Sequence, residues 1–189
     1  MTKIKPQDIT AVVVTRGGYD ISEVLDSLKG FREVKVFDNS VSPVDWRVFG
    51  RYMAMDNTEG VIYTQDDDVI VDAAAIVAAY EPSVIVANWP THHREINAPL
   101  YKGSIGPVGW GAVFDRELVE ETMSGWPLNE LFLRECDRVF TGMNQTKWID
   151  IPFRHIPRHV SMWGEGRHIS DLAEITKRIE AVKSGLPVA

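Results

Sequence analysis

The sequence predicts an α/β fold with a mostly parallel sheet flanked by helices, followed by an irregular second half. Runs of β-branched residues such as 9–15 (Ile-Thr-Ala-Val-Val-Val-Thr) are continuous, which is typical of strands buried on both faces. These runs alternate with helix-length segments, and a β-α-β order implies a parallel pair with a right-handed crossover. A chain of 189 residues is long enough for one domain with a full-sized core, so we expect a single domain over 1–189.

The first half, about 1–88, divides into four strands and three helices. Runs rich in Val, Ile and Phe mark expected strands at 9–15, 33–37, 61–64 and 83–87. Helical spacing or clustered small residues mark expected helices at about 20–29, 46–55 and 73–80. Asp72 directly precedes the third helix, and an aspartate there can accept hydrogen bonds from the first free N–H groups. It is therefore the expected N-cap.

The second half, about 89–189, has a different texture. Residues 89–107 combine Pro, Gly and two adjacent His with little periodicity, which predicts a long loop. After it we expect a Gly-rich strand at 108–114, a short helix at 117–123 capped by Asp115, a helix at 128–143, a strand at 148–151 and a terminal helix at 170–183. This asymmetry suggests that the sheet binds one substrate and the variable half another.

Composition places the chain among folded proteins. Its hydrophobic content is 44% and its charged content 25%, which is unlike a disordered chain. The single cysteine, Cys136, excludes an intrachain disulfide and fits a reducing compartment. The first ten residues are polar and no apolar run is long enough to span a bilayer, so we expect a cytoplasmic protein. A net charge of −7 argues against wholly electrostatic binding of nucleic acid.

Three consecutive carboxylates, Asp66, Asp67 and Asp68, follow the third expected strand. Mg²⁺ and Mn²⁺ prefer carboxylate oxygens, and open α/β folds bind ligands at the carboxyl ends of their strands. Asp38 ends the second expected strand in the same way. Neither a P-loop nor a Gly-x-Gly-x-x-Gly fingerprint is present, so a nucleotide diphosphate would have to be held through a metal. The structural alternative is a solvated Asp-rich turn before the next helix.

Four segments resemble, in this order, those of the GT-A glycosyltransferases, particularly the small family-2-like members with an Asp-x-Asp motif. They are 12–16, 34–40, 62–68 and 109–114, and the resemblance covers most of the chain. It implies a GT-A-like, Rossmann-like catalytic domain. Residues of about 1–88 would form the nucleotide-sugar-binding half, and about 89–189 the acceptor-binding half.

The resemblance also implies site residues. The donor, expected to be a UDP-sugar, would contact Thr15, Arg16, Asp38, Asp66, Asp67, Trp110 and Gly111. Mn²⁺ or Mg²⁺ would be bound by Asp68 and by a late histidine, for which the candidates are His155, His159 and His168. His168 is preferred because it precedes the terminal helix, as the last ligand of the family does. The alternative is a solvated or helix-capping histidine.

The catalytic base is expected within Glu135-Cys136-Asp137, where a cysteine splits the Glu-Asp pair of the family. Alignment with the family favours Asp137, with Glu135 second. On a helical wheel of about 100° per residue, Glu135 falls inside the apolar stripe and Asp137 outside it. The structural alternative is a set of surface ion pairs with Arg134 and Arg138.

These features together imply a metal-dependent glycosyltransferase, of the hexosyl or pentosyl type, that inverts the anomeric carbon. The acceptor hydroxyl could belong to a polysaccharide or to a hydroxylated base in DNA, because 147–168 interleaves aromatic and basic residues. Two other classes remain open. A sugar nucleotidyltransferase uses similar acids, although Arg16-Gly17-Gly18 is short for its Gly-rich loop. A non-catalytic sugar- or metal-binding domain would bind the donor without turnover.

Overall fold

The computed structural model describes residues 4–97, 105–157 and 169–187, and contains eight strands within these ranges. They are β1 (Thr10–Thr15), β2 (Glu33–Asp38), β3 (Val61–Asp66), β4 (Val69–Val71), β5 (Ile85–Asn88), β6 (Ala112–Asp115), β7 (Thr146–Ile149) and β8 (Phe153–His155). The helices are α1 (Ser22–Ser27), α2 (Gly50–Met53), α3 (Ala73–Ala78), α4 (Thr91–Asn97), α5 (Glu117–Met123), α6 (Glu130–Met143) and α7 (Ile169–Lys183). Short 3₁₀ turns, η1 (Pro6–Asp8) and η2 (Arg47–Phe49), precede β1 and α2.

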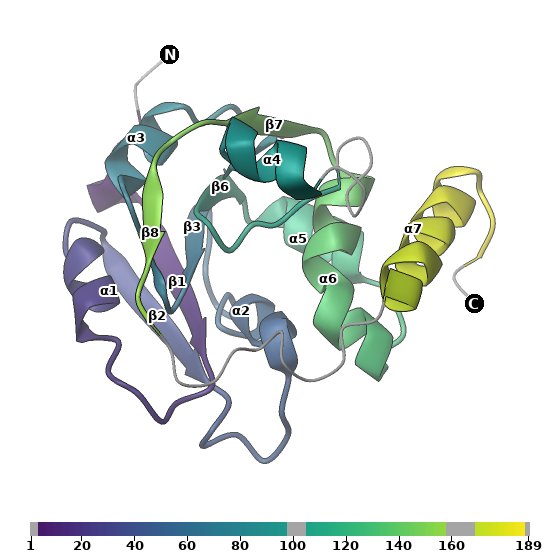
Figure 1. Ribbon diagram of the computed structural model, residues 1–189, viewed down its shortest axis with the longest axis horizontal. Helices are drawn as coiled ribbons and strands as arrows, with labels where there is room; N and C mark the ends of the chain where they lie inside the picture. The colour runs from purple at the N-terminus through teal and green to yellow at the C-terminus, as the bar shows by residue number, and fades with distance from the viewer. Residues whose placement is uncertain (1–3, 98–104, 158–168, 188–189) are drawn as a thin grey trace.

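The main sheet is mixed, with the strand order β2-β1-β3-β6-β5-β7. β1 pairs in parallel with β2 and β3, and β5 with β7, whereas β6 is antiparallel to both of its neighbours. The expectation of an α/β sheet flanked by helices is confirmed, but the sheet is only partly parallel. β6 is antiparallel because of the connection that precedes it. After β5 the chain forms α4, and no described helix leads back to the edge at which β5 begins. The chain therefore enters β6 from the edge at which β5 ends (Figure 1).

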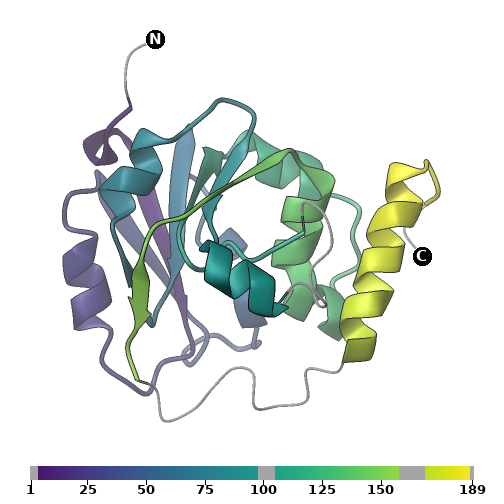
Figure 2. The ribbon, with the colours of Figure 1, turned by 45° about the horizontal axis from the view of Figure 1, so that its top comes forward.

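Two hydrophobic clusters cover the two faces of the sheet. Side chains alternate along a strand, so Val12 and Ile62 belong to a cluster with residues of α2, α5 and α6 on one face, and α7 packs on α6. Ala11, Val13 and Tyr63 pack against α1 and α3 on the other. Figures 1 and 2 show the sheet between these two groups of helices. Because both faces are covered, β1 is buried along its whole length, which explains its unbroken β-branched sequence.

Several expected elements are confirmed with shifted bounds, and three are corrected. The expected loop 89–107 contains α4. The run 69–71 pairs with β8 in a separate two-stranded ribbon that sequence spacing did not reveal, because its partner lies more than 80 positions away. The expected helix 46–55 divides into η2 and α2. None of the helices in the described ranges has both the length and the apolar run that a bilayer span requires.

The two predicted helix caps have different outcomes. Asp72 caps α3 as expected, and its side chain accepts a hydrogen bond of 3.0 Å from the backbone N–H of Ala75. Asp115 does not cap α5, whose N-cap position is Arg116. The Asp115 carboxylate instead accepts hydrogen bonds from the Tyr80 hydroxyl and the Ser83 backbone N–H, at 2.5 and 2.6 Å. The Asp115 carboxylate thus bonds to partners distant in sequence and not to the N–H groups at the start of α5.

β6 begins directly after Gly111, which has a φ of +102°. A Cβ at this position would lie 2.4 Å from Cδ1 of Ile76 and 3.0 Å from the Tyr63 hydroxyl. The left-handed backbone and the close packing both require glycine here. Gly111 therefore fixes the point at which the chain turns into the antiparallel strand.

We predict that Gly111→Ala lowers the free energy of unfolding by about 2–4 kcal/mol, through backbone strain and overpacking together. Chemical denaturation measures this loss. Gly125→Ala is the matched control, because Gly125 has a φ of +90° but no atom within 4 Å of the added Cβ. It should carry only the backbone cost, so equal losses in the two variants would contradict the packing argument.

Candidate functional site

The topology places a crevice at the carboxyl ends of β1 and β3. The chain passes from β1 to β2 on one side and then to β3 on the other, so the order of the strands reverses at β1. Open α/β sheets bind ligands at such a reversal. Thr15 pairs with Asp38, and Val14 pairs with Asp66, so the ends of three strands meet at one edge. The predicted donor contacts Thr15, Arg16, Asp38 and Asp66 all lie at this edge.

Asp66 closes β3 and is held from two directions. Its Oδ1 accepts a hydrogen bond of 2.6 Å from Nη2 of Arg51, and its backbone N–H donates to the Gly109 carbonyl at 2.6 Å. A Cβ on Gly109 would lie 2.2 Å from Oδ2 of Asp66. Glycine at position 109 therefore gives the carboxylate its space.

Arg51, from α2, is the central cation of the site, with 1% of its side chain exposed. Its guanidinium reaches a second carboxylate, with Nε 3.4 Å from Oδ1 of Asp137, and Nη1 donates to the Thr64 hydroxyl at 3.5 Å. Burial alone would lower the pKa of Arg51, but the Asp137 and Asp66 carboxylates raise it above its ordinary value. One charged group thus joins two acids that are 71 positions apart in the chain. The sequence signal for it was an arginine inside the apolar stretch 48–55, which our sequence reasoning missed.

Asp137 faces the sheet edge from α6. Its Oδ1 also accepts a hydrogen bond of 2.9 Å from the Tyr52 hydroxyl. Burial, and then the neighbouring Asp137 carboxylate, raise the pKa of Tyr52 well above its ordinary value, so the hydroxyl stays protonated and donates. The helical wheel placed Asp137 away from the apolar stripe, but its side chain is only 16% exposed and faces Arg51 and Tyr52 of α2.

Glu135 has a different environment, although it is only two residues away. Its side chain is buried and pairs with Arg138 of the same helix at 2.7 Å. The inward direction predicted from the helical wheel is confirmed. The alternative of a surface ion-pair set is wrong for this pair, because the Arg138 and Glu135 side chains are 2% and 0% exposed.

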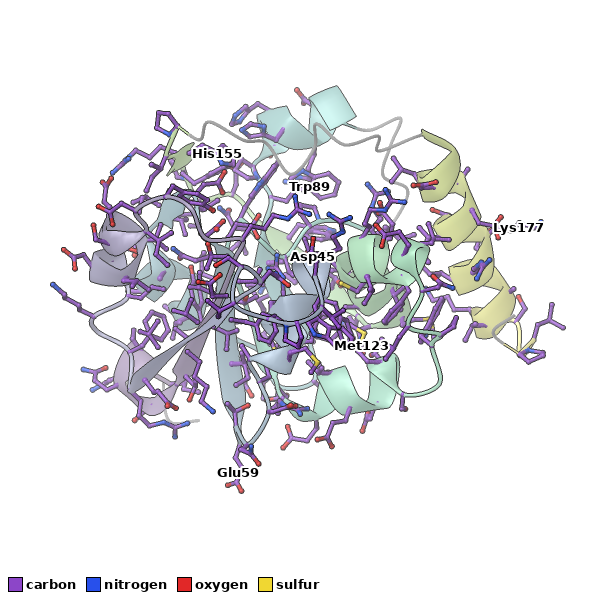
Figure 3. The ribbon with its side chains drawn as sticks, turned by 90° about the horizontal axis from the view of Figure 1, so that it is seen from below. Asp45, Glu59, Trp89, Met123, His155 and Lys177 are labelled. Atoms are coloured by element: carbon purple, nitrogen blue, oxygen red, sulfur yellow. The ribbon has the colours of Figure 1, made fainter. Side chains whose placement is uncertain are left out.

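The three consecutive acids diverge instead of forming one cluster. Asp67 is buried and accepts a hydrogen bond from the Tyr19 hydroxyl, so it is not a solvated turn residue. Oδ2 of Asp68 lies 3.3 Å from Nδ1 of the His155 ring. In Figure 3, His155 lies on the side opposite Glu59, which precedes β3. The pair of Asp68 and His155 therefore marks the carboxyl end of β3.

Of the predicted metal ligands, the structure describes Asp68 and His155, which lie beside one another. His159 and His168 lie outside the described residues, and within those residues no group of three or more potential ligands gathers. Mg²⁺ usually takes only one or two protein carboxylates beside water and substrate phosphates, and imidazole is an acceptable ligand for Mn²⁺. A carboxylate oxygen beside an imidazole nitrogen fits such a cation.

An aromatic wall stands beside this pair, and it combines three segments that are distant in sequence. The ring of Trp110 stacks on Phe153 of β8 with centroids 4.9 Å apart, and His93 of α4 lies 4.9 Å from Trp110. Partial burial, followed by the proximity of His92 and His155, lowers the pKa of His93, which keeps its ring neutral at pH 7. The predicted donor contact Trp110 thus lies in this wall, while the adjacent Gly111 serves the turn into β6.

Compared with known proteins, the chain matches no family model and no curated protein. The resemblance to GT-A glycosyltransferases therefore remains a prediction from the sequence.

We predict that Arg51→Met lowers the free energy of unfolding by about 3–5 kcal/mol, because it leaves two partly buried carboxylates without their cation. Denaturant titration at pH 7 measures this loss. The control is Lys147→Met, since Lys147 pairs with Glu81 where both side chains are nearly half exposed, and such pairs contribute at most about 1 kcal/mol. Similar losses in the two variants would show that Arg51 is not the central cation of the site.

Proposed function

We propose that this protein transfers a glycosyl group from a nucleotide-diphosphate sugar to an acceptor hydroxyl. The observation that carries the proposal is the contact of one guanidinium, that of Arg51, with both Asp66 and Asp137. It connects the strand end at which a donor would bind with the carboxylate predicted as the base. A transferase that uses a single base needs these two groups on either side of the reacting carbon.

In this proposal the donor lies along the carboxyl ends of β1, β2 and β3. Asp38 and Thr15 face its nucleoside together with Asp66, and Asp67 is a structural acid held by Tyr19. Asp68 and His155 would hold Mn²⁺ or Mg²⁺, which neutralises the charge of a diphosphate leaving group. Trp110 provides an aromatic wall at the same end of the site.

Asp137 acts as the general base. Its Oδ1 accepts a hydrogen bond from the Tyr52 hydroxyl and lies near Nε of Arg51, and these two contacts hold this oxygen in place. The acceptor oxygen attacks the anomeric carbon, the bond from that carbon to the diphosphate oxygen breaks, and the acceptor proton moves to the Asp137 carboxylate. Attack from the face opposite the leaving group inverts the anomeric centre. Glu135 is excluded from this role in the proposal because it is buried against Arg138.

For the acceptor we favour a polysaccharide hydroxyl over a hydroxylated base in DNA. The described cations of the basic segment each lie beside an acid, Lys147 by Glu81 and Arg154 by Glu23, and the whole chain has a net charge of −7. A protein that follows a phosphate backbone needs a surface with an excess of positive charge. A neutral carbohydrate makes no such demand.

The proposed reaction predicts turnover of at least one member of a panel of UDP-, GDP- and dTDP-sugars in the presence of Mn²⁺. Slow hydrolysis or transfer should release a nucleoside diphosphate, detected by chromatography, whereas nucleotidyl transfer would release pyrophosphate. Excess EDTA should abolish the reaction, and Asp68→Asn should raise the Mn²⁺ concentration needed for half-maximal rate. Binding of a donor without any turnover would instead support a non-catalytic domain.

The choice of base predicts that Asp137→Asn lowers the transfer rate by about 10²- to 10⁴-fold while donor affinity changes little, since the variant keeps the shape but loses the proton acceptor. Steady-state kinetics and donor titration measure the two quantities. Glu135→Gln is the matched comparison. It removes the carboxylate that pairs with Arg138 inside the protein, so the melting temperature should fall while the transfer rate of the folded enzyme changes little. If Glu135→Gln is inactive when folded and Asp137→Asn is active, Asp137 is not the base.

A further inference from the structure

Two arginines from separate segments converge on one exposed carboxylate at the carboxyl edge of the sheet. Nη2 of Arg16 and Nη1 of Arg47 lie 2.9 and 3.0 Å from the same oxygen, Oδ2 of Asp45. Arg47 also pairs with Glu130 of α6 at 3.2 Å. The Asp45 side chain is 42% exposed, and Figure 3 shows it in the middle of the face toward which β1 and β2 point in Figure 1.

The backbone at Arg47 is strained, and hydrogen bonds from the Asn39 side chain hold it in place. Its φ of +52° lies in the left-handed region, which a residue with a side chain adopts at an energetic cost. The buried Asn39 maintains it: its amide donates to the carbonyls of Arg47 and Thr15, at 3.1 and 3.4 Å, and its Oδ1 accepts from the Trp46 N–H at 2.8 Å. The same side chain thus ties the end of β1, which leads into Arg16, to the loop of Arg47.

This cluster lies at the end of the sheet at which the proposed donor would bind. Arg16 follows Val14 by two residues, and Val14 is the register partner of Asp66. Two planar guanidinium groups can bind a diphosphate more strongly than the single Asp45 carboxylate, because a diphosphate offers more acceptor oxygens and more negative charge. Asp45 is the more exposed member of both ion pairs, and pairs near the surface contribute little, so a ligand from solution can replace Asp45.

We propose that Arg16 and Arg47 form a binding site for a diphosphate group, and that Asp45 occupies this site as an internal anion until the ligand arrives. The identification of the ligand as the diphosphate of a nucleotide sugar rests on the proposed function. The anion site itself rests only on the two arginines, the strained loop and the exposed carboxylate between them. A diphosphate displaces Asp45 and takes over its contacts with both guanidinium groups.

The test uses inorganic pyrophosphate as the probe, with the full chain in EDTA and low salt, and isothermal calorimetry as the measurement. Arg47→Gly should weaken pyrophosphate binding by about tenfold or more, since a charged hydrogen-bond donor is lost. Its melting temperature should not fall, because glycine adopts the positive φ without strain. Asp45→Asn should tighten binding by up to about fivefold, because the internal competitor has been neutralised.

Two further variants keep the result interpretable. Ser83→Gly relieves a comparable backbone strain, at a φ of +60°, at the other end of the sheet and should leave pyrophosphate affinity unchanged. Arg16→Gln removes the other cation without touching the strained loop, so it replaces Arg47→Gly as the binding test if that variant does not fold. Unchanged affinity in the arginine variants, or weaker binding in Asp45→Asn, would overturn the proposal.

The same experiment separates this inference from the proposed function. UDP and GDP should displace pyrophosphate from the wild-type protein, whereas uridine and guanosine should not. If pyrophosphate follows the predicted order of variants and no nucleotide sugar is turned over, the anion site stands and the glycosyl-transfer proposal fails. If a nucleotide sugar is turned over while the arginine variants bind pyrophosphate normally, the glycosyl-transfer proposal stands and the anion site fails.

Discussion

The buried guanidinium of Arg51 is the interaction on which the candidate site depends. A charge in the interior is costly unless it is paired, and here it faces the carboxylates of Asp66 and Asp137 and the Thr64 hydroxyl. The arginine in turn allows two carboxylates to lie near one another without strong repulsion. Each of these groups belongs to a different element, so α2, β3 and α6 must be correctly packed for the set to form.

The antiparallel entry of β6 gives this set its surroundings. Because the chain stays at the carboxyl edge after β5, the Gly109 carbonyl reaches the N–H of Asp66 and Trp110 lies beside β8. The same edge receives Arg16 from β1 and the strained loop of Arg47. Acids, cations and aromatic rings thus lie together at one edge of the sheet. At the opposite edge, Asp115 accepts a hydrogen bond from Tyr80 that supports the fold.

The parts of the site that the sequence made visible are those whose surroundings are local. The acids at 38 and 66–68 were found because each follows a β-rich run, and the cap at Asp72 was found because a helix begins directly after it. Arg51 had no such signal, since its meaning depends on two carboxylates 15 and 86 positions away. From the sequence His155 was one of three candidate histidines and His168 was preferred, whereas the pairing of β8 with β4 brings His155 to Asp68.

The sequence by itself determined the α/β class, the strand ends that carry acids, and the inward direction of Glu135, because residue periodicity and strand composition are properties of neighbouring residues. The tertiary structure decided that the sheet is mixed, that 89–107 contains α4, and that Asp137 instead of Glu135 faces the strand end. These outcomes depend on which elements pack together. Packing is set by long-range burial and charge pairing, and a one-dimensional pattern carries little record of either.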